Sequence, residues 1–228
     1  MKRYCLYLFI LIGISCSAEL KAQKNGTIYK GNDPAVRYTG RTLVSPDGSV
    51  AFDWVGTYLE TRFTGGKLSV KVSETGTSYY NVFVDGKLHK VVKVCGTDTL
   101  IHLVSGIDKR IHSLKIQKRS EGEFGKTTVH QFVLSGSGRL AEEPAVRTRH
   151  IEFIGNSLTC GYGTDGKHRD EPFLVETENC NLTFASMVAR YYDADYTLIA
   201  HSGRGAARNY GDSVRVSKVT MKDRMLNT

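Results

Sequence analysis

Residues 27–140 alternate between apolar and polar side chains in short runs, the pattern of β-strands with one buried face. About eight runs are present, at residues 49–54, 58–63, 68–72, 79–84, 88–94, 99–103, 111–118 and 127–134. Segments 46–48, 65–66 and 85–86 are expected to be turns, and Asp85-Gly86 predicts a hairpin between the runs that flank it. Because no helical period occurs among these runs, we predict that residues 27–140 form a β-sandwich of the jelly-roll type.

The pattern changes after residues 141–149, which we interpret as a linker. Residues 151–154 and 196–200 are short apolar runs typical of buried strands. Between them, residues 181–192 predict an amphipathic helix whose apolar stripe contains Leu182, Ala185, Val188 and Tyr192. These elements predict a β-α-β unit of an open, mostly parallel sheet, a fold that binds ligands beyond the carboxyl ends of its strands.

The first 22 residues have the features of a secretory signal peptide. Lys2 and Arg3 precede an apolar segment, residues 6–14, that is too short to span a bilayer, and cleavage is expected after Ala22. We therefore predict a secreted or periplasmic protein. Lipid anchoring through Cys16 is the alternative, although the residues before Cys16 match a lipoprotein signal imperfectly.

The distribution of charge and the spacing of cysteines argue against a nucleic-acid-binding protein and against a cysteine-based zinc site. The formal net charge is +8, but the basic residues are scattered rather than clustered, and no nucleic-acid-binding motif is present, so a solvated basic surface is expected. The expected mature chain keeps Cys95, Cys160 and Cys180, without a C-x-x-C zinc pattern. A Cys160–Cys180 disulfide and two buried free thiols both agree with this spacing.

Ser157 is the candidate nucleophile. It lies at the predicted end of the first parallel strand, two residues after Gly155, where a turn exposes both its backbone N–H and its hydroxyl. Acyl transfer requires such an oxygen to attack the carbonyl and an N–H group to stabilise the resulting oxyanion. The spacing differs from the G-x-S-x-G elbow of lipases, because Leu158-Thr159 follows the serine.

The segment Ile-Gly-Asn-Ser-Leu-Thr-Cys-Gly-Tyr-Gly at residues 154–163 resembles the SGNH (GDSL-type) hydrolases, and most closely the acetyl esterases of carbohydrate esterase family two. Residues 194–211, which include His201-Ser202-Gly203-Arg204-Gly205, are similar to the second block of these enzymes. The β-rich region, with Asn81-Val82-Phe83-Val84-Asp85-Gly86, is similar to their N-terminal sandwich.

The resemblance implies a serine esterase that removes O-acetyl groups from polysaccharides or oligosaccharides. Ser157 would be the nucleophile, and the backbone N–H groups of Ser157 and Gly203 would be oxyanion donors. Asn156, which stands where many relatives carry Asp, is expected to orient the turn and, with Tyr162 and Arg204, to contact substrate. No cofactor or metal is expected. Residues 150–228 would be the first part of an SGNH-type (flavodoxin-like) α/β/α hydrolase domain.

Two blocks of the SGNH pattern have no counterpart after Gly211: the G-x-N-[DE] block that supplies the third oxyanion donor, and the D-x-x-H block that supplies the base. We therefore expect the sequence to be a C-terminally truncated copy of a longer enzyme. His150, His168 and His201 are the remaining candidates for the base. The alternative is a non-catalytic carbohydrate-binding protein or an inactive fragment.

Overall fold

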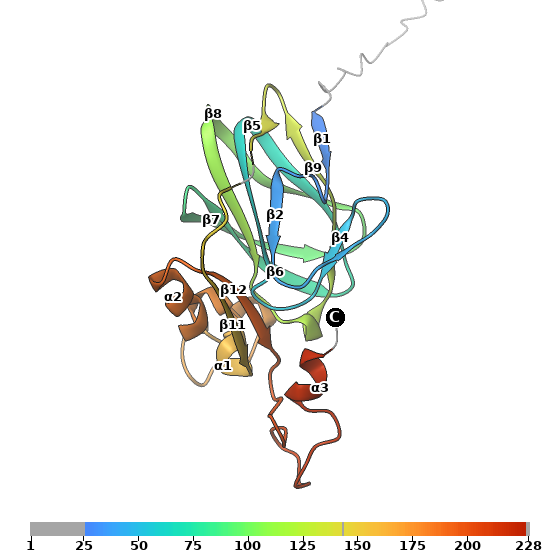
Figure 1. Cartoon of the computed structure of the whole chain (residues 1–228), viewed down its shortest axis with the longest axis vertical. Helices are drawn as coiled ribbons and strands as arrows, with labels where there is room; N and C mark the ends of the chain where they lie inside the picture. The colour runs from blue at the N-terminus through green and yellow to red at the C-terminus, as the bar shows by residue number, and fades with distance from the viewer. Residues whose placement is uncertain (1–25, 143, 227–228) are drawn as a thin grey trace, which may run out of the picture.

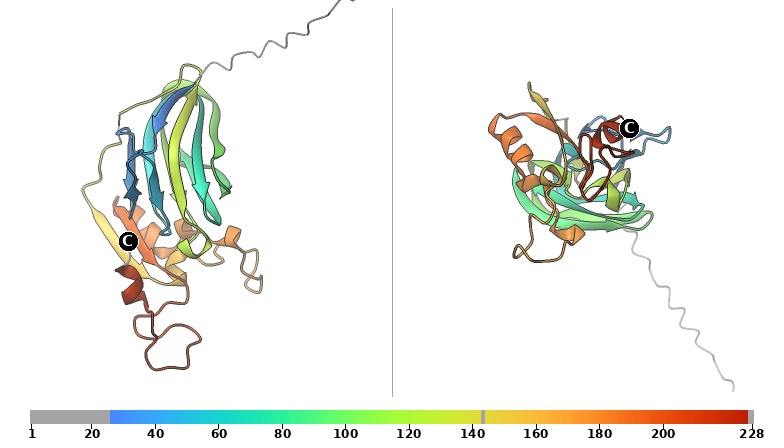
Figure 2. Two further views of the ribbon diagram at one scale, coloured as in Figure 1. Left: turned by 90° about the vertical axis from the view of Figure 1, so that its right-hand side faces the viewer. Right: turned by 90° about the horizontal axis from the view of Figure 1, so that it is seen from below.

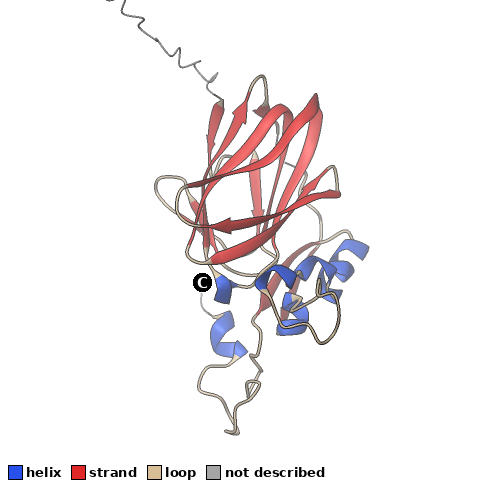
Figure 3. Cartoon of the chain, turned by 180° about the vertical axis from the view of Figure 1, so that it is seen from behind, coloured by secondary structure: helices blue, strands red, loops and turns tan. Residues whose placement is uncertain are grey.

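The computed structural model describes residues 26–142 and 144–226 of the chain. Strands make up most of the first part, and the helices gather at one end of the sheet (Figure 3). The predicted signal peptide, with Cys16, lies outside the described residues. Among the helices that are described, none has the length and apolar character needed to cross a membrane.

The first part is one ten-stranded antiparallel sheet (Figure 1). Its central order is β3-β4-β9-β5-β8-β6-β7, with β1 paired to β9 and both β2 and β10 paired to β5. The strands are β1 (Thr27–Lys30), β2 (Val36–Thr39), β3 (Leu43–Val44), β4 (Val50–Phe52), β5 (Tyr58–Glu74), β6 (Thr77–Val84), β7 (Lys87–Cys95), β8 (Thr99–Lys118), β9 (Thr127–Ser135) and β10 (Arg139–Leu140). Seven of the eight predicted runs lie wholly in strands, and the run at residues 49–54 contains the shorter β4. The runs at 99–103 and 111–118, predicted separately, belong to one strand, β8.

The prediction of a turn at Gly65-Gly66 is wrong. The runs on either side of it belong to one strand, β5, which pairs with β8 from Tyr58 to Val72. The two glycines have φ angles of +35° and +75°, and the register shifts between Thr64 and Leu68. Such a bulge bends a strand without ending its ladder, and glycine takes the positive φ without a steric penalty.

The predicted hairpin at Asp85-Gly86 is confirmed. Strands β6 and β7 pair antiparallel up to Val84 and Lys87, and both turn residues have positive φ angles, +50° and +76°. Two positive φ angles are the signature of the type I′ turn, whose twist matches that of the adjoining strands.

The buried face of the sheet carries one apolar cluster, and we call this cluster the sheet core. It is built from alternate residues of the long strands, so the period of two in the sequence becomes one buried face. Its fully buried members include Phe63, Leu68, Val82, Leu103, Phe132 and Leu134.

The second part is a β-α-β unit, as predicted. Strands β11 (His150–Gly155) and β12 (Asp195–Ala200) are parallel. The chain between them forms α1 (Ser157–Cys160), the 3₁₀ turns η2 (Val175–Thr177) and η3 (Cys180–Leu182), and α2 (Phe184–Tyr191). The short helix α3 (Met221–Met225) ends the described chain, and the 3₁₀ turn η1 (Gly122–Phe124) lies between β8 and β9.

The predicted helix exists, but its buried face differs from the prediction. Ala185, Ser186 and Ala189 are buried, whereas three residues of the predicted stripe, Leu182, Val188 and Tyr192, are exposed. The helix packs through its small residues, which allow it to lie close to β12.

The β-α-β unit packs against one end of the sheet, and we call this contact the boundary (Figure 2). Its apolar part joins Val55 and Tyr58 of the sheet region to Cys160, Cys180, Ala185, Ala189, Tyr196, Leu198 and Ala200 of the unit. Gly56 shows how close the two parts are, because a Cβ atom on it would lie 2.6 Å from Leu198 Cδ1.

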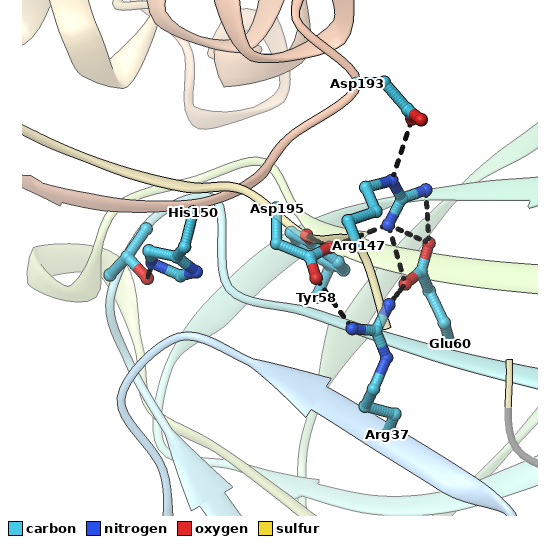
Figure 4. A network of polar contacts seen from close by, with 8 residues as sticks. Arg37, Tyr58, Glu60, Arg147, His150, Asp193 and Asp195 are labelled. Atoms are coloured by element: carbon cyan, nitrogen blue, oxygen red, sulfur yellow. Dashed lines mark hydrogen bonds and ion pairs between the residues drawn. The ribbon is translucent and has the colours of Figure 1, made fainter. Parts of the chain in front are cut away.

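Charged side chains complete the boundary (Figure 4). The Asp195 carboxylate accepts hydrogen bonds from Arg37, Arg147 and the Tyr58 hydroxyl, each at 2.7 Å. Both arginines also bond to Glu60 of β5. Strand β12 is thereby fixed to β2, to β5 and to the segment that precedes β11.

Candidate functional site

The register of the parallel strands places two loops side by side. Gly155 at the end of β11 pairs with Ala200 at the end of β12, so residues 156–157 and 201–203 emerge at the same edge. Residues 156–157 and 202–203 border a cleft of about 720 Å³. All five site residues predicted from the sequence line this cleft: Asn156, Ser157, Tyr162, Gly203 and Arg204. The other four lining residues are Ser202, Gly205, Arg208 and Tyr210.

Ser157 is the first residue of α1, and the preceding asparagine caps this helix. Asn156 Oδ1 accepts the N–H of Leu158 at 3.1 Å, and the Asn156 carbonyl accepts those of Thr159 and Cys160. A side-chain acceptor at this position satisfies a backbone donor that lacks a partner within the helix. The asparagine thus orients the turn without a carboxylate charge.

Gly155 makes the turn geometrically possible. A Cβ atom on it would lie 2.0 Å from Thr159 Oγ1, a distance at which the two atoms clash. Because only glycine avoids this clash, the strand can turn directly into α1 and present the half-buried Ser157 to the cleft.

Two backbone N–H groups in the loops are available to a ligand. Within residues 26–142 and 144–226, neither the Ser157 N–H nor the Gly203 N–H donates to a protein acceptor. Gly203 has a φ of +74°, and no atom lies within 4 Å of the position that a Cβ would occupy there. A pair of free N–H donors beside a serine hydroxyl can stabilise an oxyanion formed at that hydroxyl.

The side chains of the cleft wall are aromatic and cationic. The Tyr162 ring stacks on Phe173 with 3.7 Å between ring centroids, which fixes its orientation. Arg204 donates to the Val219 carbonyl at 3.3 Å, and Tyr210 is 93% exposed. Tyr210 is not among the site residues predicted from the sequence, although it lies in residues 194–211, the second block of the resemblance.

None of the candidate histidines hydrogen-bonds to Ser157. His150 Nε2 contacts Thr197 Oγ1 at 2.9 Å, and His168 is exposed. His201 is buried, with Nε2 2.8 Å from a Glu123 carboxylate oxygen and Nδ1 2.9 Å from the Ser202 carbonyl. Among the described residues, no side chain is therefore in place to take the proton from Ser157 Oγ.

A buried polar cluster lies behind the two loops. The potential ligand atoms of Glu121, Cys160 and Glu178 lie within 4.8 Å of one another. Burial, followed by the nearby charge of Glu121, raises the pKa values of Cys160 and Glu178, which favours their neutral forms. Because a metal would need the deprotonated forms, these residues fit a hydrogen-bonded cluster better than a cation site. Cys160 and Cys180 are both buried free thiols.

Comparison with known proteins gives a consistent family assignment. Residues 38–144 match the family described as carbohydrate esterase 2 N-terminal. The chain is 34% identical over 180 residues to the cellulase/esterase CelE of Acetivibrio thermocellus, which covers 79% of this chain and 22% of the relative. It is 32% identical over 177 residues to an acetylxylan esterase / glucomannan deacetylase of Cellvibrio japonicus, covering 75% and 48%.

A solved structure gives the same picture. A family two carbohydrate esterase from Clostridium thermocellum, in complex with cellohexaose, is 34% identical with a TM-score of 0.75, and the match covers 78% of this chain and 55% of that one. The chain thus spans from about a fifth to just over half of the length of these relatives. Residues 38–144 match the N-terminal domain of carbohydrate esterase family 2, and the chain resembles the enzymes of that family over most of its length.

Proposed function

We propose that the chain carries the nucleophile and two oxyanion donors of an SGNH-type serine esterase that removes O-acetyl groups from polysaccharides or oligosaccharides. The observation that carries this proposal is the placement of Ser157 and of two free N–H groups, those of Ser157 and Gly203, on one cleft. The named activities of the relatives supply the substrate class.

In the proposed reaction, Ser157 Oγ attacks the acetyl carbonyl carbon, and the carbonyl oxygen becomes an oxyanion held by the two N–H groups. Collapse of this intermediate expels the sugar hydroxyl and leaves an acetyl-serine, which water then hydrolyses to acetate. The proposal assigns the base to none of the described residues, because none of their side chains hydrogen-bonds to Ser157 Oγ. It uses no cofactor.

The cleft volume and lining suit a carbohydrate. Its volume of about 720 Å³ lies within the common range for ligand sites, ~300–1,000 Å³. Tyr162, held by Phe173, offers a ring edge and face to a sugar, and Arg204 and Asn156 offer hydrogen-bond donors. We assign these three residues to substrate binding.

The finer organisation is part of the same proposal. Residues 27–140 would be a jelly-roll sandwich domain, 141–149 a linker, and 150–228 the first part of an SGNH-type domain. The signal peptide at 1–22 would direct export to the periplasm or the medium, with a lipid anchor at Cys16 as the alternative. These assignments rest on the sequence pattern and the resemblance to the family.

The test is hydrolysis of p-nitrophenyl acetate and of acetylated oligosaccharides by the protein expressed from its complete reading frame. We expect Ser157→Ala to lower kcat by at least ~10³-fold. The matched control is Ser105→Ala, because Ser105 is exposed on β8 and lies outside the cleft. Full activity in Ser157→Ala would overturn the nucleophile assignment.

A second candidate function is binding of carbohydrate without hydrolysis. It is favoured because, within the part of the chain that the structure describes, no side chain hydrogen-bonds to Ser157 Oγ to act as a base. Calorimetry with bare and acetylated oligosaccharides separates the two functions. Binding by a wild-type protein that releases no acetate would support the non-catalytic alternative.

A further inference from the structure

One carboxylate from the sheet region reaches both loops of the candidate site. Glu121, three residues after the end of β8, is 1% exposed. Its Oε2 accepts the Ser202 N–H at 2.7 Å and lies 3.6 Å from Cys160 Sγ, which donates to it. Ser202 directly precedes Gly203, and Cys160 ends the helix that begins at Ser157.

Residues of the β-α-β unit also contact Glu121 and fix its position. Its backbone N–H donates to Glu178 Oε2 at 2.9 Å, and Glu178 is fully buried. The neighbouring Arg119 donates to the Glu178 carbonyl at 2.7 Å. Burial and then the nearby charge of Glu121 raise the pKa of Glu178, which favours the neutral form of Glu178. A charged acceptor makes the stronger hydrogen bond to an N–H.

The bond to Ser202 matters because of the residue that follows. Gly203 lies in the left-handed region with open space around its Cα, so its own sterics do not fix its conformation. The Glu121–Ser202 bond fixes the peptide plane before Ser202, the point from which the loop runs to the Gly203 N–H. Two backbone bonds shape the loop locally, because the Arg204 N–H donates to the His201 carbonyl and the Tyr210 N–H donates to the Gly203 carbonyl. The Glu121 bond adds the anchor that ties this turn to the sheet region. Without that anchor the direction of the Gly203 N–H relative to Ser157 would vary, and an oxyanion donor is effective only when it is preorganised.

We propose that Glu121 is a positioning residue for the oxyanion donor of Gly203, so that the N-terminal sheet supplies a working part of the esterase site. The catalytic consequence rests on the function proposed above, whereas the structural link between Glu121 and Ser202 does not. A sheet that only supported the second domain would not need a buried carboxylate directed at this loop.

The first experiment measures the link directly on the 228-residue chain, using the backbone amide signals of Ser202 and Gly203 in ¹H–¹⁵N NMR. An N–H that donates to a carboxylate resonates downfield and exchanges slowly with solvent. We expect the Ser202 proton to move upfield in Glu121→Gln and further in Glu121→Ala, and its exchange to accelerate by at least ~10-fold in Glu121→Ala. Unchanged signals in both folded variants would overturn the proposal.

The second experiment measures catalysis by the protein from the complete reading frame. Loss of one oxyanion donor typically costs ~10²–10³-fold in rate, so its misorientation should cost less. We expect kcat to fall ~10-fold in Glu121→Gln, which keeps an acceptor oxygen, and ~10²-fold in Glu121→Ala, with KM changed by less than ~2-fold.

The matched control is Glu74→Gln. Glu74 is also a buried glutamate of the sheet region, and it accepts the Gly76 N–H at 3.3 Å, away from the cleft. We expect this variant to keep the wild-type kcat. An equal fall of kcat in Glu74→Gln would overturn the proposal by attributing the loss to general destabilisation. If Ser157→Ala were fully active, the esterase function would fail, and the NMR experiment would still decide whether Glu121 orders the loop.

Discussion

The sheet core and the boundary contain different kinds of buried groups. The sheet core consists mainly of apolar side chains, among them Phe63 and Leu134. The boundary has fewer apolar residues and adds buried or nearly buried charges, among them Arg37, Glu60 and Asp195. Apolar burial is non-directional and stabilises many arrangements of similar density, whereas hydrogen bonds between charged groups need one geometry. The sheet core therefore supplies stability, and the boundary fixes how the site loops lie against the sheet.

This difference predicts that the largest loss of stability follows from a truncation in the sheet core. Phe132 is fully buried on β9, so Phe132→Ala removes a whole ring from a packed interior. We expect about 4 kcal/mol of destabilisation, measured by urea unfolding, with little dependence on pH or salt. A strong pH dependence of this loss would show that the sheet core and the boundary are not energetically distinct.

A smaller loss is expected for the boundary, with a different signature. Asp195→Ala leaves two guanidinium groups and the Tyr58 hydroxyl without their shared acceptor, which we expect to cost about 3 kcal/mol at pH 7. The exposed neighbour Asp193 is the control, and Asp193→Asn should cost less than about 0.5 kcal/mol, because asparagine removes the charge and tolerates the positive φ of this residue.

The pH dependence of this second loss follows from the pKa of Asp195. Burial alone would raise it, but the hydrogen bonds from Arg37, Tyr58 and Arg147 outweigh burial and lower the pKa of Asp195 to about 2, from 3.8. A lowered pKa means that the stabilisation is present above pH 3.8 and is lost as the pH falls through about 2. The difference between wild type and Asp195→Ala should shrink over that window. A constant difference would contradict the ion-pair explanation.

The last prediction concerns the pH dependence of stability at Glu178, which runs in the opposite direction to that at Asp195. Burial and the charge of Glu121 raise the pKa of Glu178, so its contribution to stability is complete at pH values below its unfolded pKa and is lost as the pH rises toward the folded value. Glu178→Gln stays neutral and should flatten the stability profile between pH 4.5 and about 8, the window in which the wild-type carboxyl group loses its stabilising neutral form. Thermal unfolding across this range measures it, and parallel wild-type and variant profiles would refute it.

Much of the fold could be predicted because the chain repeats simple periods. Alternation located the long strands, and the Asp85-Gly86 pair gave the hairpin. The short strands β1, β2, β3 and β10 have only two to four residues, too few to show a period. The bulge at Gly65-Gly66 was predicted as a turn because glycine permits both, and only the partner strand β8 decides between them.

The candidate site also has residues that the sequence could predict and residues that it could not. Residues close in sequence to a strand end, such as Ser157 and Gly203, could be placed at the cleft, because parallel strands bring their carboxyl ends together. Glu121 could not be predicted, since its partner Ser202 lies 81 residues away and no local pattern connects them. The buried face of α2 was also beyond prediction, because the exposure of Leu182, Val188 and Tyr192 depends on what packs against the helix.

The hydrogen bond between Arg37 and Asp195 can form only late in synthesis, because the two residues are far apart in the sequence. The two residues are 158 positions apart, and a ribosome adds ~5–20 residues per second, so Arg37 emerges roughly 10–30 s before its partner exists. During that interval Glu60 is already available to Arg37, because it is only 23 residues away. The nascent sheet can therefore neutralise its arginine early and exchange part of that contact for Asp195 when β12 is made.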